Sequence, residues 1–326
     1  SYSMINTEDR WSPALRAISQ VTQALEAEVS FGLTLFPDPT SNNVDSTEVN
    51  MCQSWGRDLY NCQEDVSACS PGRVLVQTEV NNSFSVREAL NNYPPVPNQA
   101  TPTYSALQAA SEALLMEQSD SAEKVVILVT DGMPGCNFQN NPTTCTCLTS
   151  APFFCEFDNF AGMCLDDNRT VQEVTRLTGL GIKTIVVGMT IGLPTEGPCI
   201  SNNECASGGQ ACMNGGCVNL APSVLSNMAR AGGDPNGQYY SVDNLNEIEA
   251  QITRATASVA PCVFDIADIP EALYDRLVVY LDGDVVPKDE NRMNGWWAER
   301  GVLEFYGNTC DSVRDGMSHR IAARCE

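Results

Sequence analysis

The feature that most constrains this chain is its fifteen cysteines, which accompany a single histidine in 326 residues. Metal binding explains them poorly, because they lie in stretches rich in Asn, Gly and Pro, where disulfides usually hold irregular loops. We therefore expect a disulfide framework formed in an oxidising compartment. Since fifteen is odd, one thiol should stay free or pair outside the chain. The cysteines are Cys52, Cys62, Cys69, Cys136, Cys145, Cys147, Cys155, Cys164, Cys199, Cys205, Cys212, Cys217, Cys262, Cys310 and Cys325.

Most of these cysteines fall in three polar segments, at about residues 40–72, 133–167 and 193–219, which interrupt an otherwise regular pattern. We interpret the segments as loop insertions whose cysteines mostly pair within their own insertion. The four cysteines of the third insertion should form two bridges among themselves, because that segment holds too few apolar residues to bury a core. The spacing does not determine their connectivity.

The charge balance limits the partners of the chain, which has 41 acidic against 18 basic residues and a formal net charge of −23. Such a surface disfavours nucleic acids and anionic membranes, whose phosphates it would repel. No apolar run reaches the roughly 18 residues of a membrane-spanning helix, and no signal peptide is visible. We expect a soluble extracellular or cell-surface protein, with any export signal or lipid anchor upstream of residue 1.

Helix-like and strand-like patterns alternate over the first 258 residues. The two clearest strands, residues 124–130 and 183–189, are unbroken apolar runs, which predicts burial on both faces and a central position in a parallel sheet. The order of elements predicts an α/β domain with a doubly wound, mostly parallel sheet over residues 1–258. Helices are expected at 11–28, 104–116, 170–177, 222–230 and 245–257, and the remaining strands at 29–36, 74–78 and 238–242.

Residues 259–326 lack helical periodicity and predict a small antiparallel β domain. Its strands are expected at 263–266, 277–281, 302–305 and 320–323, with a hairpin turn at Asp282-Gly283. The adjacent Trp296 and Trp297 could form a recognition patch, although tryptophans in a small β domain usually fill its core.

Three polar positions stand where a doubly wound sheet binds its ligands, outside the carboxyl ends of its central strands. Asp131 directly follows the apolar run 124–130, Thr101 precedes the helix at 104–116, and Ser1 and Ser3 open the chain. Hydroxyl and carboxylate oxygens are hard ligands, which suit Mg²⁺, Mn²⁺ or Ca²⁺ rather than zinc. We expect these four residues to surround one divalent cation, with Mg²⁺ as the first choice.

Each of these positions also has an ordinary structural explanation. Ser1 and Ser3 could be a frayed terminus, and Asp131 followed by glycine is a common turn. We expect Thr103 to cap the helix while Thr101 binds the metal, and the reverse assignment remains open.

Other polar residues are expected to be structural. The acidic pairs Asp166-Asp167 and Asp282/Asp284 could hold Ca²⁺, but we expect them to be solvated surface. His319 is expected to be an ordinary strand residue, since no nucleophile arrangement accompanies it.

The sequence here resembles the von Willebrand factor A family, which includes the inserted domains of integrins. The metal-ion-dependent adhesion site of that family combines Asp-x-Ser-x-Ser, a distant threonine and an aspartate after a buried strand. Ser1 and Ser3, followed by Met4, match the two serines, Thr101 in QATPTYSAL matches the threonine, and Asp131 in VILVTDG matches the aspartate. The resemblance continues through MARAGG at 228–233 and covers roughly residues 1–258.

The chain departs from the family pattern in two places. Gln99 and Ala100 replace the usual glycine pair, which a turn tolerates. The aspartate two positions before Ser1 and the whole first strand of the family fold are absent. Because that strand lies between the segments at 29–36 and 124–130, its omission would leave backbone groups unpaired in the core. We expect one of three explanations: the first strand exists in the natural protein but is missing from this sequence, it was cleaved but stays bound, or another subunit donates it.

The resemblance implies a binding protein, not an enzyme, in which a cation held through hydroxyls accepts an acidic side chain of a protein partner. A divalent ion would supply the local attraction that a surface at −23 lacks. The cysteine-rich insertions look like those of secreted bacterial adhesins. The alternative is a structural subunit that assembles with copies of itself into a surface or extracellular complex. A metal-dependent hydrolase would need a general base beside the ion, and the sequence offers no convincing one.

Overall fold

The structure, a computed structural model, describes residues 4, 9–27, 29–40, 46–54, 56, 58–95, 100–116, 123–148, 155, 161–189, 198–199, 205, 210–213, 215–234, 237–257, 262–314 and 319–325. The chain divides into two compact units, Ser1–Ile252 and Thr253–Glu326. No helix among the described residues has the length and apolar character needed to cross a membrane.

The first unit contains a parallel sheet with strand order β3-β4-β7, formed by β3 (Lys124–Thr130), β4 (Ile182–Met189) and β7 (Tyr240–Val242). The predicted parallel pairing of the two apolar runs is confirmed, with Lys124 opposite Ile182 and Thr130 opposite Gly188. Nearly every residue of β4 is buried, whereas most of β3 is only half-buried. The two runs are therefore similar in sequence but differ in how completely the fold covers them.

A second, antiparallel sheet pairs β1 (Phe31–Leu35) with β2 (Arg73–Glu79). Among the described strands, β1 pairs only with β2, and β3 pairs only with β4. The predicted central position of β3 is therefore wrong for the described part of the chain, because no described segment pairs with its second edge. One helix, α6 (Thr103–Met116), packs against β1, β2 and β3 and so lies over both sheets.

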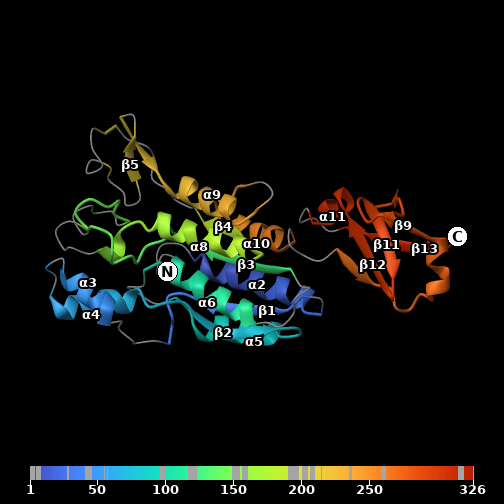
Figure 1. Cartoon of the computed structure of the whole chain (residues 1–326), viewed down its shortest axis with the longest axis horizontal. Helices are drawn as coiled ribbons and strands as arrows, with labels where there is room; N and C mark the ends of the chain where they lie inside the picture. The colour runs from blue at the N-terminus through green and yellow to red at the C-terminus, as the bar shows by residue number, and fades with distance from the viewer. Residues whose placement is uncertain are drawn as a thin grey trace. The chain divides into compact units, whose positions relative to one another are not determined.

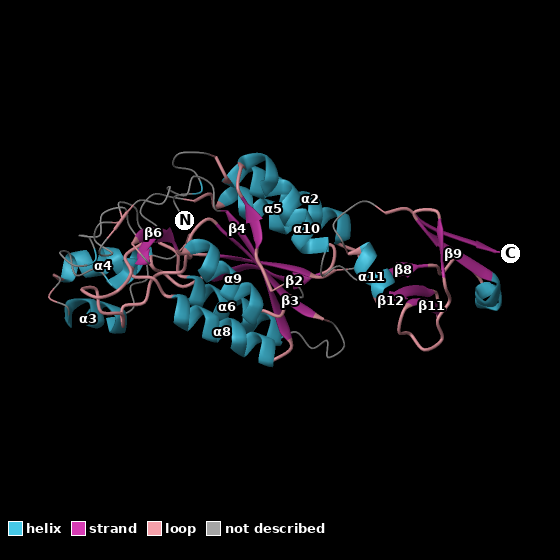
Figure 2. Ribbon diagram, turned by 90° about the horizontal axis from the view of Figure 1, so that it is seen from above, coloured by secondary structure: helices cyan, strands magenta, loops and turns pink. Residues whose placement is uncertain are grey.

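Helices cover both sides of these strands, which gives the first unit three layers. Figure 2 shows α2 (Trp11–Leu25) and α5 (Ser83–Asn92) on one side, and α6, α8 (Asp167–Gly179) and α9 (Ala221–Ala231) on the other. The apolar stripe of α2 packs with α5 and with β1 and β2. Helix α5 was not predicted. At the predicted position follow η3 (Leu245–Glu247) and α10 (Ile248–Ala257), and the first unit ends within α10.

The first two insertions pack together around disulfides. The first insertion was predicted to be a loop, but it forms α3 (Ser46–Ser54) and α4 (Leu59–Ala68) (Figure 1). The Cys52–Cys62 disulfide joins the two helices. This expectation was wrong because Val49 and Val66 find apolar partners among the half-cystines of the second insertion, which includes η1 (Ala161–Met163). The second insertion holds Cys145–Cys164 and Cys147–Cys155, and Cys69–Cys136 links the two insertions.

The third insertion contains a short hairpin of β5 (Gln210–Met213) and β6 (Gly216–Asn219). Its four cysteines pair as Cys199–Cys212 and Cys205–Cys217. The sulfurs form a small buried cluster of their own. Disulfides thus replace the apolar core that this segment cannot build.

The second unit is a β structure of two antiparallel three-stranded sheets that share one core. One sheet has the order β10-β9-β13 and the other β11-β12-β8. Asp282 and Gly283 form the predicted turn, with φ of 54° and 99°. The elements are β8 (Val263–Asp265), η4 (Glu271–Arg276), β9 (Leu277–Leu281), β10 (Asp284–Val286), β11 (Gly295–Glu299), β12 (Val302–Tyr306), α11 (Asn308–Val313) and β13 (Ile321–Cys325).

The cysteines of the second unit leave one free thiol. Cys262 and Cys310 form a bridge at the edge of the core, and Cys325 is unpaired and exposed at the end of β13. The expectation of a disulfide at Cys325 is corrected accordingly, because this unit has three cysteines and two of them pair with each other.

Candidate functional site

Asp131 lies at the carboxyl end of β3, where the chain leaves the sheet. Thr130, the last residue of the strand, is buried, and its Oγ1 donates to the carbonyl of Gly132 at 2.9 Å, which holds the turn after the strand. The Oδ2 atom of Asp131 is buried and has no hydrogen-bond partner among the described residues. A carboxylate oxygen in this state is poorly compensated for its lost hydration.

Thr101 lies beside Asp131 because the segment that leads into α6 hydrogen-bonds to the segment that follows β3. The backbone N–H of Gly135 donates to the carbonyl oxygen of Thr101 at 2.9 Å. The hydroxyl oxygen of Thr101 is 3.7 Å from the position that a Cβ on Gly132 would take. Thr101 and Asp131, which are 30 positions apart in sequence, therefore meet at the same end of the unit.

The two threonines before α6 have different environments. Thr103 is the first residue of the helix and is buried, and its hydroxyl donates to the carbonyl of Thr101 at 3.4 Å, a long contact. Its backbone N–H donates to the same carbonyl at 2.8 Å. Thr103 thus holds the helix entry as a donor from the first helical residue, and not as the cap that was expected. The hydroxyl of Thr101 faces Gly132 instead.

The sulfur-rich insertions lie directly next to these two residues. Ala100 packs against their core, and its N–H donates to the carbonyl of Ala68 at 3.1 Å. The Cys69–Cys136 disulfide joins the end of α4 to the loop after β3. The backbone around Thr101 and Asp131 is therefore held by a covalent bridge as well as by hydrogen bonds.

Ser1 and Ser3 lie outside the described residues, so their expected place beside Asp131 stays a prediction. The adjoining Met4 is described and buried, and its carbonyl accepts the N–H of Arg10 at 2.9 Å. This bond ties the residue after Ser3 to the start of α2.

Asp166 differs from its expected role as solvated surface. It is buried, and its carboxylate accepts hydrogen bonds from Asn137 and Arg169, both at 2.8 Å. Burial raises the pKa of Asp166 above its ordinary value, and Arg169 offsets part of this effect. The guanidinium of Arg169 also lies 4.2 Å from the ring centroid of Tyr104 on α6. The cluster connects the second insertion to α6, and its carboxylate already has partners.

The other acidic pair and the histidine belong to the second unit. His319 Nδ1 lies 2.6 Å from Asp282 Oδ2, and the backbone N–H of Arg320 donates to the same carboxylate at 2.8 Å. These hydrogen bonds hold the pKa of Asp282 below its ordinary range. Asp284 is exposed. His319 therefore helps to hold the turn at Asp282-Gly283. It precedes β13, so the expectation of a strand residue was wrong.

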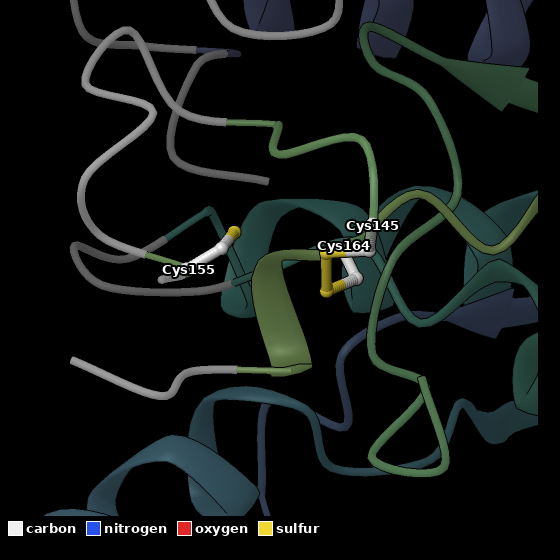
Figure 3. Close-up of side chains that lie close together, drawn as sticks. All are labelled: Cys145, Cys155 and Cys164. Atoms are coloured by element: carbon white, nitrogen blue, oxygen red, sulfur yellow. A yellow bond between two sulfur atoms is a disulfide. The ribbon is translucent and has the colours of Figure 1, made fainter. Parts of the chain in front are cut away.

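Two groups of three cysteines bring their sulfurs within 4.8 Å of one another, as metal-binding thiolates would. Figure 3 shows one group, in which Cys145 and Cys164 are joined and Cys155 lies nearby. Cys155 is itself bonded to Cys147. In the second group, Cys199, Cys205 and Cys217 are all oxidised as well. A disulfide sulfur is not a thiolate ligand, so these clusters are structural.

Comparisons with known proteins bear on the fold alone. The crystal structure of a pilus adhesin, SpaC from Lactobacillus rhamnosus GG, aligns with 94% of this chain at a TM-score of 0.50 and 13% identity. The alignment covers 36% of the adhesin, so this chain spans about a third of that protein. No family model and no curated protein matches the sequence.

Two other solved structures align less well. An aerotolerance-related membrane protein from Bacteroides fragilis NCTC 9343 has a TM-score of 0.41 and 15% identity, over 77% of this chain and 90% of that one. A conserved hypothetical protein, BatB from Bacteroides thetaiotaomicron, has a TM-score of 0.39 and 16% identity, over 78% and 91%. The elements of the first unit make the chain an α/β protein, and disulfides like those of its insertions form outside the reducing cytosol.

Proposed function

We propose that the chain is a divalent-cation-dependent adhesion or protein-binding module of the von Willebrand factor A type. The observation that carries this proposal is the buried Oδ2 of Asp131, which has no hydrogen-bond partner among the described residues. Leaving a buried polar atom unsatisfied costs roughly 1–3 kcal/mol, and more for a charged group. A cation beside Asp131 would remove this cost.

In the proposed site, Asp131 supplies the charged ligand and Thr101 a hydroxyl, with Ser1 and Ser3 as further hydroxyl ligands. Mg²⁺ is the expected ion, and Mn²⁺ or Ca²⁺ would suit the same oxygen atoms. A cation held mainly by neutral hydroxyls keeps most of its positive charge, so it would attract a carboxylate of the partner. A partner that presents Asp or Glu would otherwise be repelled by a chain with net charge −23.

We propose binding without chemical turnover at this site. A metal-activated water needs a general base within hydrogen-bond reach. The carboxylate of Asp166 is occupied by Asn137 and Arg169. The Asp166 carboxylate is therefore not free to serve as that base. His319 belongs to the second unit, where its Nδ1 contacts Asp282.

We also propose that β1–β2 and β3–β4–β7 are parts of one doubly wound sheet. Support comes from α6, which packs against strands of both sheets, and from the unpaired edges of β1 and β3 in the described chain. One additional strand would satisfy both edges and would cover the half-buried β3. An extracellular or surface location fits the seven disulfides and the fold likeness to a pilus adhesin.

The test is to measure cation binding by the whole chain, using calorimetry and thermal unfolding with Mg²⁺, Mn²⁺ or EDTA. Asp131→Asn should abolish binding, and Thr101→Val should weaken it at least tenfold, while Thr103→Val should reduce stability more than affinity. Asp268→Asn, at an exposed aspartate, is the matched control. Equal Mg²⁺ affinity in wild type and Asp131→Asn would refute the proposed site.

The second candidate function is a self-assembling structural subunit, which the unpaired edge of β3 favours. A strand from another copy could pair there. Mass photometry in EDTA separates the candidates. Concentration-dependent oligomers that persist without divalent ions would favour assembly, and a monomer that captures acidic partners only with Mg²⁺ would favour adhesion.

A further inference from the structure

A hollow lies on the open face of the β11–β12 hairpin in the second unit. It has a volume of roughly 180 Å³, is open to solvent, and is lined by Arg292, Trp297, Glu299, Arg300, Val302, Glu304 and Tyr306. The proposed cation site belongs to the first unit, so the hollow is a separate feature of the chain. Its lining combines two aromatic rings with four charged side chains.

The alternation of the two strands decides which side chains reach this face. Trp296, Ala298, Leu303 and Phe305 point into the core and are at most 6% exposed. Trp297 lies opposite Glu304 in the register, and Tyr306 is two residues further along β12. The rings of Trp297 and Tyr306 therefore share one face with the charged residues. Trp297 is half-buried, unlike its neighbour Trp296.

Several contacts hold Trp297 in place before any ligand arrives. Its Nε1 donates to Glu299 Oε2 at 3.4 Å, and Glu299 pairs with Arg292. The Arg292 guanidinium lies 5.9 Å from the ring centroid, and the ammonium of Lys288, which does not line the hollow, lies 5.1 Å from it. A ring oriented in advance loses little conformational freedom on binding.

Tyr306 is fixed in a similar way. Its hydroxyl donates to Glu304 Oε2 at 2.5 Å. Burial, together with Glu304, raises the pKa of Tyr306 to about 12. The phenol therefore remains a neutral hydrogen-bonding group throughout the physiological range.

The two arginines occupy backbone positions that arginine rarely adopts. Arg292 has φ 56° and Arg300 has φ 51°, in the left-handed region. Arg300 precedes Gly301 in the two-residue turn between β11 and β12, where Asn-Gly or Asp-Gly is the favoured pair. Asparagine would adopt this conformation more easily than arginine.

The charges of the hollow cancel, although the chain as a whole is strongly acidic. Arg292 and Arg300 balance Glu299 and Glu304, whereas the chain carries −23. Glu299 is already paired with Arg292, and Glu304 with Tyr306. The four formal charges sum to zero, so the lining has no net charge that would select a cation or an anion. The lining instead fits a neutral ligand that has an apolar face and many hydroxyls.

We propose that this hollow binds a neutral carbohydrate. The C–H face of a pyranose ring packs on an aromatic ring, because its slightly positive hydrogens meet the negative π face. Planar guanidinium and carboxylate groups can donate to and accept from pairs of neighbouring sugar hydroxyls.

The experiment titrates the intact chain with soluble cello-, chito- and malto-oligosaccharides while EDTA is present. Binding is followed by tryptophan fluorescence and by calorimetry. We expect one of the three series to bind, with an affinity that does not change with salt. Trp297→Ala and Tyr306→Ala should each weaken binding about tenfold or more, as expected for central aromatic anchors. Trp297→Phe should retain part of the affinity.

Two controls keep the result interpretable. Phe84→Ala, at an exposed aromatic residue of the first unit, should bind like wild type. Equal thermal unfolding of Trp297→Ala and wild type shows that the hairpin is intact. Three outcomes overturn the proposal: no binding of any series, binding unaffected by Trp297→Ala, or binding that weakens steadily with salt, which would indicate a charged ligand. Because EDTA is present throughout, failure of the proposed cation site would not affect this test.

Discussion

The β3–β4–β7 sheet and the β11–β12–β8 sheet differ in how much of their surface can serve binding. Helices cover both sides of the strands in the first unit, so a side chain can reach a ligand only where a strand ends, as Asp131 does after β3. In the second unit, one face of the β11–β12 hairpin packs on the core and the other faces solvent. Its candidate residues therefore lie in the middle of strands.

This difference changes how a candidate site can be recognised. A site at strand ends is marked in sequence by a polar residue after an apolar run. On a sheet face, alternate side chains of each strand point to solvent and to the core, and a site can form only from the solvent-facing ones. An error of one residue in the strand register exchanges the two groups. The following substitutions test this contrast, in order of decreasing expected effect.

The largest effect should come from exchanging the two adjacent tryptophans for alanine. Trp296 is 1% exposed, and its Nε1 donates to the carbonyl of Val286 at 3.0 Å, across the two sheets of the second unit. Trp296→Ala should cost about 3–5 kcal/mol, as for other large core aromatics, and Trp297→Ala less than about 1 kcal/mol. Hydrogen exchange of peptides from the second unit measures both values. Similar costs would contradict the assignment of the two faces.

In the first unit, the largest effect is expected at the contact between α9 and β4. A Cβ on Gly232 would lie 2.1 Å from the carbonyl oxygen of Thr184, so Gly232→Ala must displace backbone. We expect a loss of about 1–3 kcal/mol in chemical denaturation. Gly179→Ala, where nothing lies within 4 Å, is the matched control and should be neutral or stabilising by about 0.4–1 kcal/mol.

Asp131→Asn should change stability less than the preceding substitutions do. The sign of the change should depend on whether EDTA or Mg²⁺ is present. In EDTA the variant should be equally stable or more stable, by up to about 1 kcal/mol, because it removes the charge of a half-buried carboxylate whose buried Oδ2 has no hydrogen-bond partner among the described residues. With Mg²⁺ the order should reverse, since ligand binding stabilises the wild type. A variant that is less stable in both conditions would mean that the carboxylate has a structural role.

The smallest effect should be the acid sensitivity of the second unit. Backbone N–H groups of Asn294 and Met293 donate to Asp289 and hold its pKa below the ordinary 3.8. A lowered pKa contributes stability above about pH 4, and this contribution is lost as the pH falls through the folded pKa. The unfolding temperature should therefore drop below pH 4, less steeply in Asp289→Asn. Equal slopes would show that Asp289 contributes nothing.

The regular parts of the fold were predictable because their patterns are strong. The strand expected at residues 124–130 coincides with β3, since an apolar run closed by Asp131-Gly132 has few alternatives. Helix α5 was missed because its apolar residues, such as Val86 and Leu90, lie in a short polar segment. The helices of the first insertion were missed because their apolar partners are half-cystines from another insertion.

In the candidate sites, too, features that depend on partners distant in sequence could not be predicted. Thr101 and Asp131 could be placed together, because strand ends of an α/β sheet meet on one side. The Cys69–Cys136 bridge could not be expected from a rule that pairs cysteines locally. Asp166 was expected in solvent, because its burial depends on Asn137 and Arg169 folding over it. The sequence also left open which tryptophan would face outward, since both stand at adjacent positions.

The Cys69–Cys136 bridge has a mechanical consequence. It closes a covalent ring over a sequence separation of 67 residues, and Thr101 and Asp131 both lie inside that ring. Tension applied to the chain on either side of the ring passes through the sulfur–sulfur bond, so the enclosed segment cannot be extended. At about 3.4 Å per residue, the bridge shortens the fully extended length of a pulled molecule by roughly 230 Å. Under load, the segment with the two candidate ligands would remain a closed loop while the rest of the chain lengthens, unless the bridge is reduced.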